Sequence, residues 1–93
     1  MFAYAGAIKT LLAPLTALEL AQNVLLQSGF TIFDPLQPGK VTMCGEHASG
    51  VLVTVVSIDC EGGSATVVNA FSPSDAAAAQ QMMVTVYQTI QSA

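Results

Sequence analysis

The sequence predicts an α+β fold, a two-layer sandwich in which an antiparallel meander sheet of three or four strands carries an N-terminal and a C-terminal helix on one face. The expected order of elements is α-β-β-β-β-α. The main observation is a run rich in β-branched residues, Gly50–Cys60, which a Gly62-Gly63 turn signal separates from a second such run, Ser64–Phe71. This is the pattern of a β-hairpin. Helix-capping patterns precede and follow the strands, and 93 residues correspond to a single domain, residues 1–93.

The run Gly50–Cys60 is expected to lie in the middle of the sheet. Both of its alternating sets of side chains are apolar. The two sets are Val51, Val53 and Val55, and Leu52, Val56 and Ile58. A strand that is apolar on both sides needs cover on both faces.

Residues 1–13 fit more than one structure. Phe2, Ile8 and Leu12 are compatible with a short helix, with an irregular arm that packs on a second subunit, or with an extended strand. We expect a short helix that packs on its own domain. The first positive charge is Lys9, whereas a secretory signal begins with a positive segment, so no signal peptide is expected.

A first helix is predicted over residues 17–28. Thr16 and Glu19 have the spacing of a capping box, and Leu15 and Leu20 that of a hydrophobic staple. Gly29 provides the left-handed stop. The apolar side chains of this helix cover more than half of its circumference, which favours a second contact besides the sheet.

Two short strands, residues 30–33 and 40–44, are expected to precede the central run. A second helix is predicted over residues 73–91, with Ser72 as cap, Pro73 at the first helical position and Asp75 at the third. Its apolar residues recur at spacings of three and four, which is typical of a core-facing stripe. They are Ala76, Ala79, Met83, Val86 and Ile90.

The composition excludes several kinds of partner. Only 9% of the residues are charged, the net charge is −4, and Lys9 and Lys40 are the two basic residues. Binding to nucleic acid or to an anionic membrane surface needs several Lys or Arg residues, so neither is expected. No apolar run reaches the roughly 18 residues of a membrane span. Because 53% of the residues are hydrophobic, we expect that a homodimer buries part of the apolar surface.

Cys44, Glu46 and His47 form the only cluster of chemically active side chains, with Cys60 elsewhere. Three interpretations compete: a metal site, a Cys44–Cys60 disulfide, and nucleophilic catalysis by Cys44 with His47 as base. If residues 45–49 form the loop between two strands, Cys44 lies opposite Gly50, and Cys60 lies about 30 Å farther along the strand. This distance argues against a disulfide or a shared metal, and no third group for catalysis is recognisable. No metal and no cofactor are therefore expected.

Asn69 is the remaining candidate residue. With Gly62-Gly63 as the turn, Asn69 faces Val56, where its amide is buried or lines a small pocket. Cys44, Glu46, His47 and Asn69 are together the candidate ligand-binding residues.

The function that this pattern favours is a small non-enzymatic binding or protein-interaction module that acts as a homodimer and holds an apolar small ligand or a peptide. The alternatives are a structural self-assembling protein and an enzyme that uses Cys44, His47 or Glu46. A cytoplasmic location is expected, with a mature exported protein as the alternative.

Overall fold

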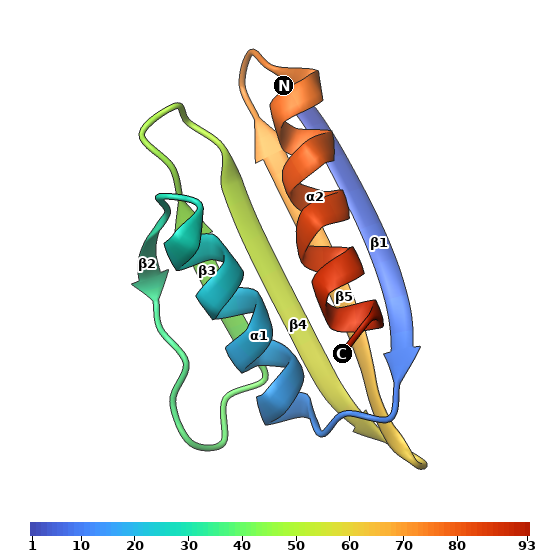
Figure 1. Ribbon diagram of the computed structural model, residues 1–93. Helices are drawn as coiled ribbons and strands as arrows, with labels where there is room; N and C mark the ends of the chain where they lie inside the picture. Colours follow the sequence, from blue (N-terminus) through green and yellow to red (C-terminus); the bar gives the residue numbers. More distant parts are fainter.

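Five antiparallel strands form one sheet in the order β1-β5-β4-β3-β2, and two helices cover one of its faces (Figure 1). The computed structural model describes residues 1–93. Its elements are β1 (Phe2–Thr10), α1 (Pro14–Gln27), β2 (Thr31–Asp34), β3 (Thr42–Glu46), β4 (Leu52–Cys60), β5 (Gly63–Ser72) and α2 (Ala76–Gln91). The protein is therefore an α+β protein, as predicted.

The N-terminal segment is a strand, so the expected short helix there is wrong. The predicted order α-β-β-β-β-α is matched from α1 to α2, but β1 precedes it and makes the sheet five-stranded where three or four strands were predicted. Strand β1 pairs with β5 along its whole length, from Phe2 opposite Ser72 to Thr10 opposite Ser64. Its Tyr4 and Ile8 pack against the core under the helices. This pairing and packing override the helix propensity of the alanines in the segment.

The predicted hairpin is confirmed, and β4 is the central strand of the five. The turn, however, is Glu61-Gly62 rather than Gly62-Gly63, with Cys60 opposite Gly63. Gly62 has a φ of 82°, which a glycine adopts without strain. Gly63 belongs to the strand, where a Cβ would lie 1.9 Å from the carbonyl oxygen of Thr10.

Helix α1 begins earlier than predicted, because Pro14 occupies its first turn. The N-cap is Ala13, which makes no side-chain cap hydrogen bond. The predicted capping box of Thr16 and Glu19 is therefore wrong, and the fixed φ of Pro14 accounts for the earlier start. The predicted stop is confirmed, since Gly29 has a φ of 85° directly after the helix.

Helix α2 begins three residues later than predicted. Asp75 is its N-cap, and the Asp75 carboxylate accepts a hydrogen bond of 3.0 Å from the N–H of Ala78. Ser72 acts one turn earlier, where its hydroxyl oxygen accepts a hydrogen bond of 2.9 Å from the N–H of Asp75. The predicted apolar stripe is confirmed in Ala79, Val86 and Ile90, which are all fully buried.

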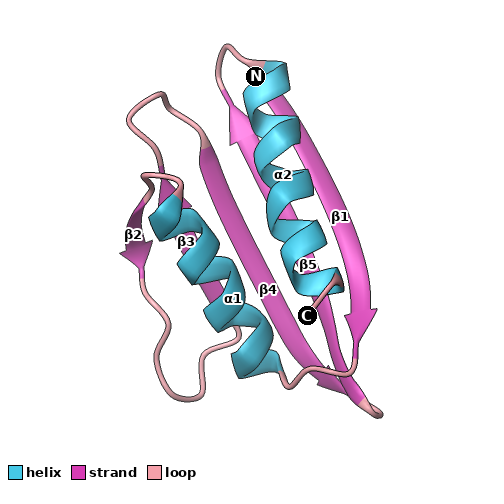
Figure 2. Ribbon diagram, in the orientation of Figure 1, coloured by secondary structure: helices cyan, strands magenta, loops and turns pink.

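The core lies between the sheet and the two helices, which sit on the same side of it (Figure 2). Helix α2 packs over β1 and β5, and α1 packs over β4, β3 and β2. Nothing within the chain covers the opposite face of the sheet. Neither helix is long and apolar enough to cross a membrane.

Candidate functional site

The uncovered side of the sheet, here called the open face, is mostly apolar. The alternation of exposed and buried positions along β1, β3, β4 and β5, together with the strand register, assigns its residues. They are Ala3, Ala5, Ala7 and Lys9 on β1, Ala65, Val67, Asn69 and Phe71 on β5, Leu52, Thr54, Val56, Ile58 and Cys60 on β4, and Thr42, Cys44 and Glu46 on β3. Ile58 is 51% exposed and Val67 is 38% exposed, so water contacts β-branched apolar side chains in the middle of a sheet.

A polar row crosses the open face between apolar rows. Asn69 lies opposite Ala5 on one side and Thr54 on the other, Thr54 lies opposite Cys44, and Cys44 lies opposite Asp34 of β2. Asn69 therefore faces Thr54, not Val56 as predicted, because the turn of the hairpin is shifted by one residue. The Asn69 amide is half-buried and makes no side-chain hydrogen bond inside the chain.

The charges of the open face lie at its corners. Lys9 stands at the end of β1, in the row of Ala65 and Ile58, and Glu46 stands at the end of β3, in the row of Leu52 and Phe71. Beyond β3, Asp34 and Lys40 form an ion pair. The centre of the open face therefore holds no charge.

The surroundings of Cys44 do not activate its thiol. Burial raises its pKa, the neighbouring Asp34 carboxylate raises it further, and Lys40 acts in the opposite direction. A nucleophilic cysteine needs the reverse arrangement, with positive charge stabilising the thiolate. Both Cys44 and Cys60 are free thiols.

The structure separates His47 from Cys44 and Glu46. Cys44 and Glu46 belong to the open face, whereas His47 continues the alternation toward the helix side, where its ring lies 5.2 Å from the ring of Phe30. The Nδ1 atom of His47 accepts a hydrogen bond of 3.1 Å from the N–H of Ser49. Cys44 and His47 do not come together as nucleophile and base.

Cys60 is also distant from the candidate cluster. Cys44 lies opposite Thr54, not Gly50, so Cys60 is six residues farther along β4, or about 20 Å. The predicted 30 Å was too long, because β3 extends to Glu46. No group of three His, Cys, Asp or Glu side chains could hold a metal ion.

Strand β1 is an edge strand, and half of its backbone groups have no partner in the sheet. The two-residue turn makes Cys60 and Gly63 a hydrogen-bonded pair, and this pattern alternates along each strand. The bond from the N–H of Ser57 to the carbonyl of Val41 fits the same alternation. It follows that the N–H and C=O groups of β1 residues with odd numbers face away from β5. These residues are Ala3, Ala5, Ala7 and Lys9.

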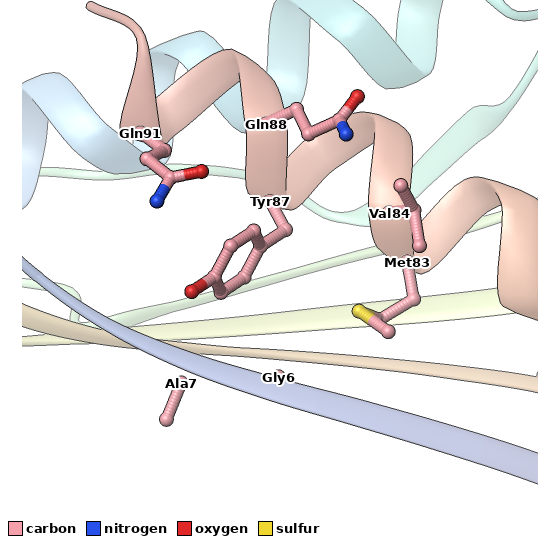
Figure 3. A pocket seen from close by; sticks show the side chains of 7 residues that line it. All are labelled: Gly6, Ala7, Met83, Val84, Tyr87, Gln88 and Gln91. Atoms are coloured by element: carbon pink, nitrogen blue, oxygen red, sulfur yellow. The ribbon is translucent and has the colours of Figure 1, made fainter.

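A groove of about 390 Å³ runs beside this edge, between β1 and α2. We call it the edge groove; it is lined by Gly6, Ala7, Met83, Val84, Tyr87, Gln88 and Gln91. Figure 3 shows Gly6 directly beneath the side chains of Met83 and Tyr87, while Ala7 points to the other side of the strand. A Cβ on Gly6 would lie 3.0 Å from both side chains, so Met83 and Tyr87 pack directly on this glycine and a larger residue would push them into the groove.

The sequence matches no model of a known protein family, and a comparison with curated proteins finds no significant relative. The chain's own geometry therefore carries the functional argument.

Sequence reasoning missed the edge and its groove. The available signal was the period-two pattern of residues 3–9, in which Ala3, Ala5 and Ala7 alternate with Tyr4 and Ile8.

Proposed function

We propose that this protein is a small non-enzymatic interaction module that acts as a homodimer, and that two copies pack through the open face. The observation that carries the proposal is the exposure of Val67 in the uncharged centre of the sheet, together with that of Ile58 toward the hairpin end. Sheets with such faces bury them, because contiguous apolar surface in contact with water is unfavourable.

The size of the open face suits a stable dimer. Strands β1, β5, β4 and β3 have 9, 10, 9 and 5 residues, so with a rise of about 3.3 Å per residue and a strand spacing of about 4.8 Å the face spans on the order of 500 Å². A standard interface buries about 800 Å² of accessible surface on each partner, and the pleated face offers more accessible surface than its flat outline.

The charges suit a two-fold arrangement. A symmetric dimer brings the same patch of both copies together, so each contact occurs twice. Lys9 and Glu46 stand at diagonally opposite corners of the open face. A two-fold axis that lies in the plane of the interface, crosses the strands obliquely and passes through the midpoint between these corners exchanges the two. Each lysine then meets the partner's Glu46. The same axis passes beside Asn69 and places it against the partner's Asn69, where the two amides satisfy each other's hydrogen bonds. A polar pair of this kind fixes the register of an apolar interface.

The mass of the particle in solution tests the proposal. At tens of micromolar, native mass spectrometry or light scattering should give twice 9.6 kDa, or 19.2 kDa. Val67→Lys should raise the dimer dissociation constant by at least about a hundredfold, because it buries an unpaired charge. The matched control is Gln80→Lys, which adds the same charge at an exposed position of α2 and should leave the dimer intact. A wild-type particle of 9.6 kDa at this concentration would contradict the proposed homodimer.

A charge exchange tests the two-fold geometry. Lys9→Glu should weaken the dimer, and so should Glu46→Lys, because each places like charges at the corner. The double variant should restore wild-type affinity. Additive weakening in the double variant would contradict the pairing of Lys9 with the partner's Glu46.

A further inference from the structure

We infer that the outer edge of β1 accepts an extended segment of a partner polypeptide as a sixth strand, with an apolar side chain of that segment in the edge groove and an acidic side chain beside Lys9. This inference names the partner class of the proposed interaction module and rests on that function. The backbone edge of β1 lies outside the open face, so a dimer leaves it accessible. The Lys9 side chain stands at the corner where the two meet, and its ammonium group then lies between Glu46 of the partner subunit and the acidic side chain of the guest.

Unpaired backbone groups provide the attraction. Ala3, Ala5, Ala7 and Lys9 present four N–H and four C=O groups in a nine-residue strand. Proteins normally protect such an edge with charges, proline, a bulge or a short strand. Here β1 has one charged residue, no proline and an unbroken register with β5. Main-chain hydrogen bonds to an edge of this kind supply affinity for an added strand.

The edge groove provides side-chain selectivity. An added strand that is hydrogen-bonded to Ala5 and Ala7 turns the side chain opposite Gly6 toward α2. That side chain lies in the edge groove beside Met83, Val84 and Tyr87. The groove wall carries no charge, because α2 has no charged residue. It therefore fits an aliphatic side chain, with the amides of Gln88 and Gln91 at its rim (Figure 3).

Charge complementarity fixes the register of the segment on β1. Lys9 is the only charged side chain on β1, and it lies three residues from Gly6. The guest residue directly opposite Lys9 is therefore favoured as Asp or Glu, since cross-strand pairs of opposite charge are stabilising. In an antiparallel guest this gives an acidic residue followed three positions later by an aliphatic one.

A second copy of β1 fits this edge less well than a partner segment. A symmetric pairing centred on the strand would place Gly6 opposite the partner's Gly6 and leave both grooves unfilled. It would also bring no acidic residue to Lys9, because β1 contains none.

The test uses a fluorescein-labelled nonapeptide of alternating Thr and Val with Glu at its second position and Leu at its fifth. Aligned antiparallel to residues 2–10, it places Glu opposite Lys9 and Leu opposite Gly6. Fluorescence anisotropy should show saturable binding. Replacing the Leu by Gly, or the Glu by Lys, should weaken binding by about tenfold each, equivalent to about 1.4 kcal/mol.

Backbone methylation provides the matched control. N-methyl groups at the fourth and sixth positions of the peptide, opposite Ala7 and Ala5, remove the donors that face β1 and should abolish binding. N-methyl groups at the third and seventh positions face outward and should leave binding within about twofold, since no hydrogen bond to β1 is lost. Equal loss with both patterns would overturn the inference.

Two protein variants separate this inference from the proposed dimer. Val84→Glu places a charge in the wall of the edge groove, on α2 and away from the open face, and should reduce peptide affinity while the particle remains a dimer. Val67→Lys should give a monomer that still binds the peptide. No binding at millimolar peptide would overturn the inference. Dissociation of the dimer by Val84→Glu would also overturn it, since a second copy would then occupy the edge groove.

Discussion

The hydroxyl groups of Ser57 on β4 and Thr66 on β5 lie 2.9 Å apart in the buried layer beneath the helices. Both side chains are fully buried, so each hydroxyl depends on the other for a hydrogen bond. Thr66→Val removes one partner and leaves the Ser57 hydroxyl unsatisfied, which should lower the free energy of unfolding by about 1–3 kcal/mol. Urea unfolding measures this change.

The double variant Ser57→Ala with Thr66→Val serves as the control for that prediction. It removes both partners, so its loss should be smaller than the sum of the two single losses. Strictly additive losses would mean that the two hydroxyls do not depend on each other.

Two adjacent glycines should respond very differently to substitution. Gly63→Ala would place a Cβ 1.9 Å from the Thr10 carbonyl oxygen and 2.8 Å from the Cα of Leu11, both of which are backbone atoms. The strands β1 and β5 must separate there, with an expected loss of about 3 kcal/mol or more. Gly62→Asn should lose about 1 kcal/mol or less, because Asn tolerates positive φ and nothing lies within 4 Å. Thermal unfolding of the two variants compares them, and equal stabilities would contradict the close approach at Gly63.

The cap of α2 should contribute measurably to stability. Asp75→Ala removes the hydrogen bond from the N–H of Ala78 and should lower the free energy of unfolding by about 1 kcal/mol. Asp75→Asn keeps an accepting oxygen and should lose less. Thr16→Ala provides a comparison in α1, where the structure places no cap at this residue and a change within about 0.5 kcal/mol is expected.

Cys44 should titrate above the ordinary range of a thiol. Burial and Asp34 raise its pKa, so at a given pH its thiolate fraction is smaller than that of an unperturbed cysteine. In a Cys60→Ser background, the rate of alkylation by iodoacetamide should rise with pH and reach its midpoint above the usual thiol value. Asp34→Asn removes one cause of the raised pKa and should move the midpoint to lower pH. Glu61→Gln, in the distant hairpin turn, should leave it unchanged.

The parts of the fold that sequence reasoning predicted correctly are governed by local patterns. The β4–β5 hairpin has β-branched runs around a glycine turn, and Gly29 ends its helix as the sequence indicates. Helix starts were less well predicted. Thr16 has the right spacing from Glu19 for a cap, but Pro14 already begins the helix, so the spacing has no effect.

Strand β1 could not be predicted because its structure depends on a distant partner. Residues 2–10 are rich in alanine, which by itself favours a helix. Pairing with residues 64–72 determines the strand, and the period-two alternation of residues 3–9 does not by itself outweigh the helix propensity of the alanines. The edge groove depends on the same contact, since Gly6 and Tyr87 are brought together only when β1 has docked.

Cys44 and His47 lie on opposite faces of the sheet for a geometric reason. Cys44 and His47 are three residues apart, which a tight loop could bring together. The strand instead continues through Gly45 and Glu46, and alternation along a strand sends residues three apart to opposite faces. Cys44 and Asn69, which are distant in the sequence, share one row of the open face.

The pairing of residues 2–10 with residues 64–72 also has a consequence for how the protein is made. During translation β1 leaves the ribosome long before its partner, and the sheet can close only after β5 has been synthesised. Sheets dominated by such distant pairings fold in about milliseconds to seconds, not microseconds. A nine-residue apolar strand with one charge is unpaired throughout that interval, which exposes it to chaperones and to neighbouring nascent chains.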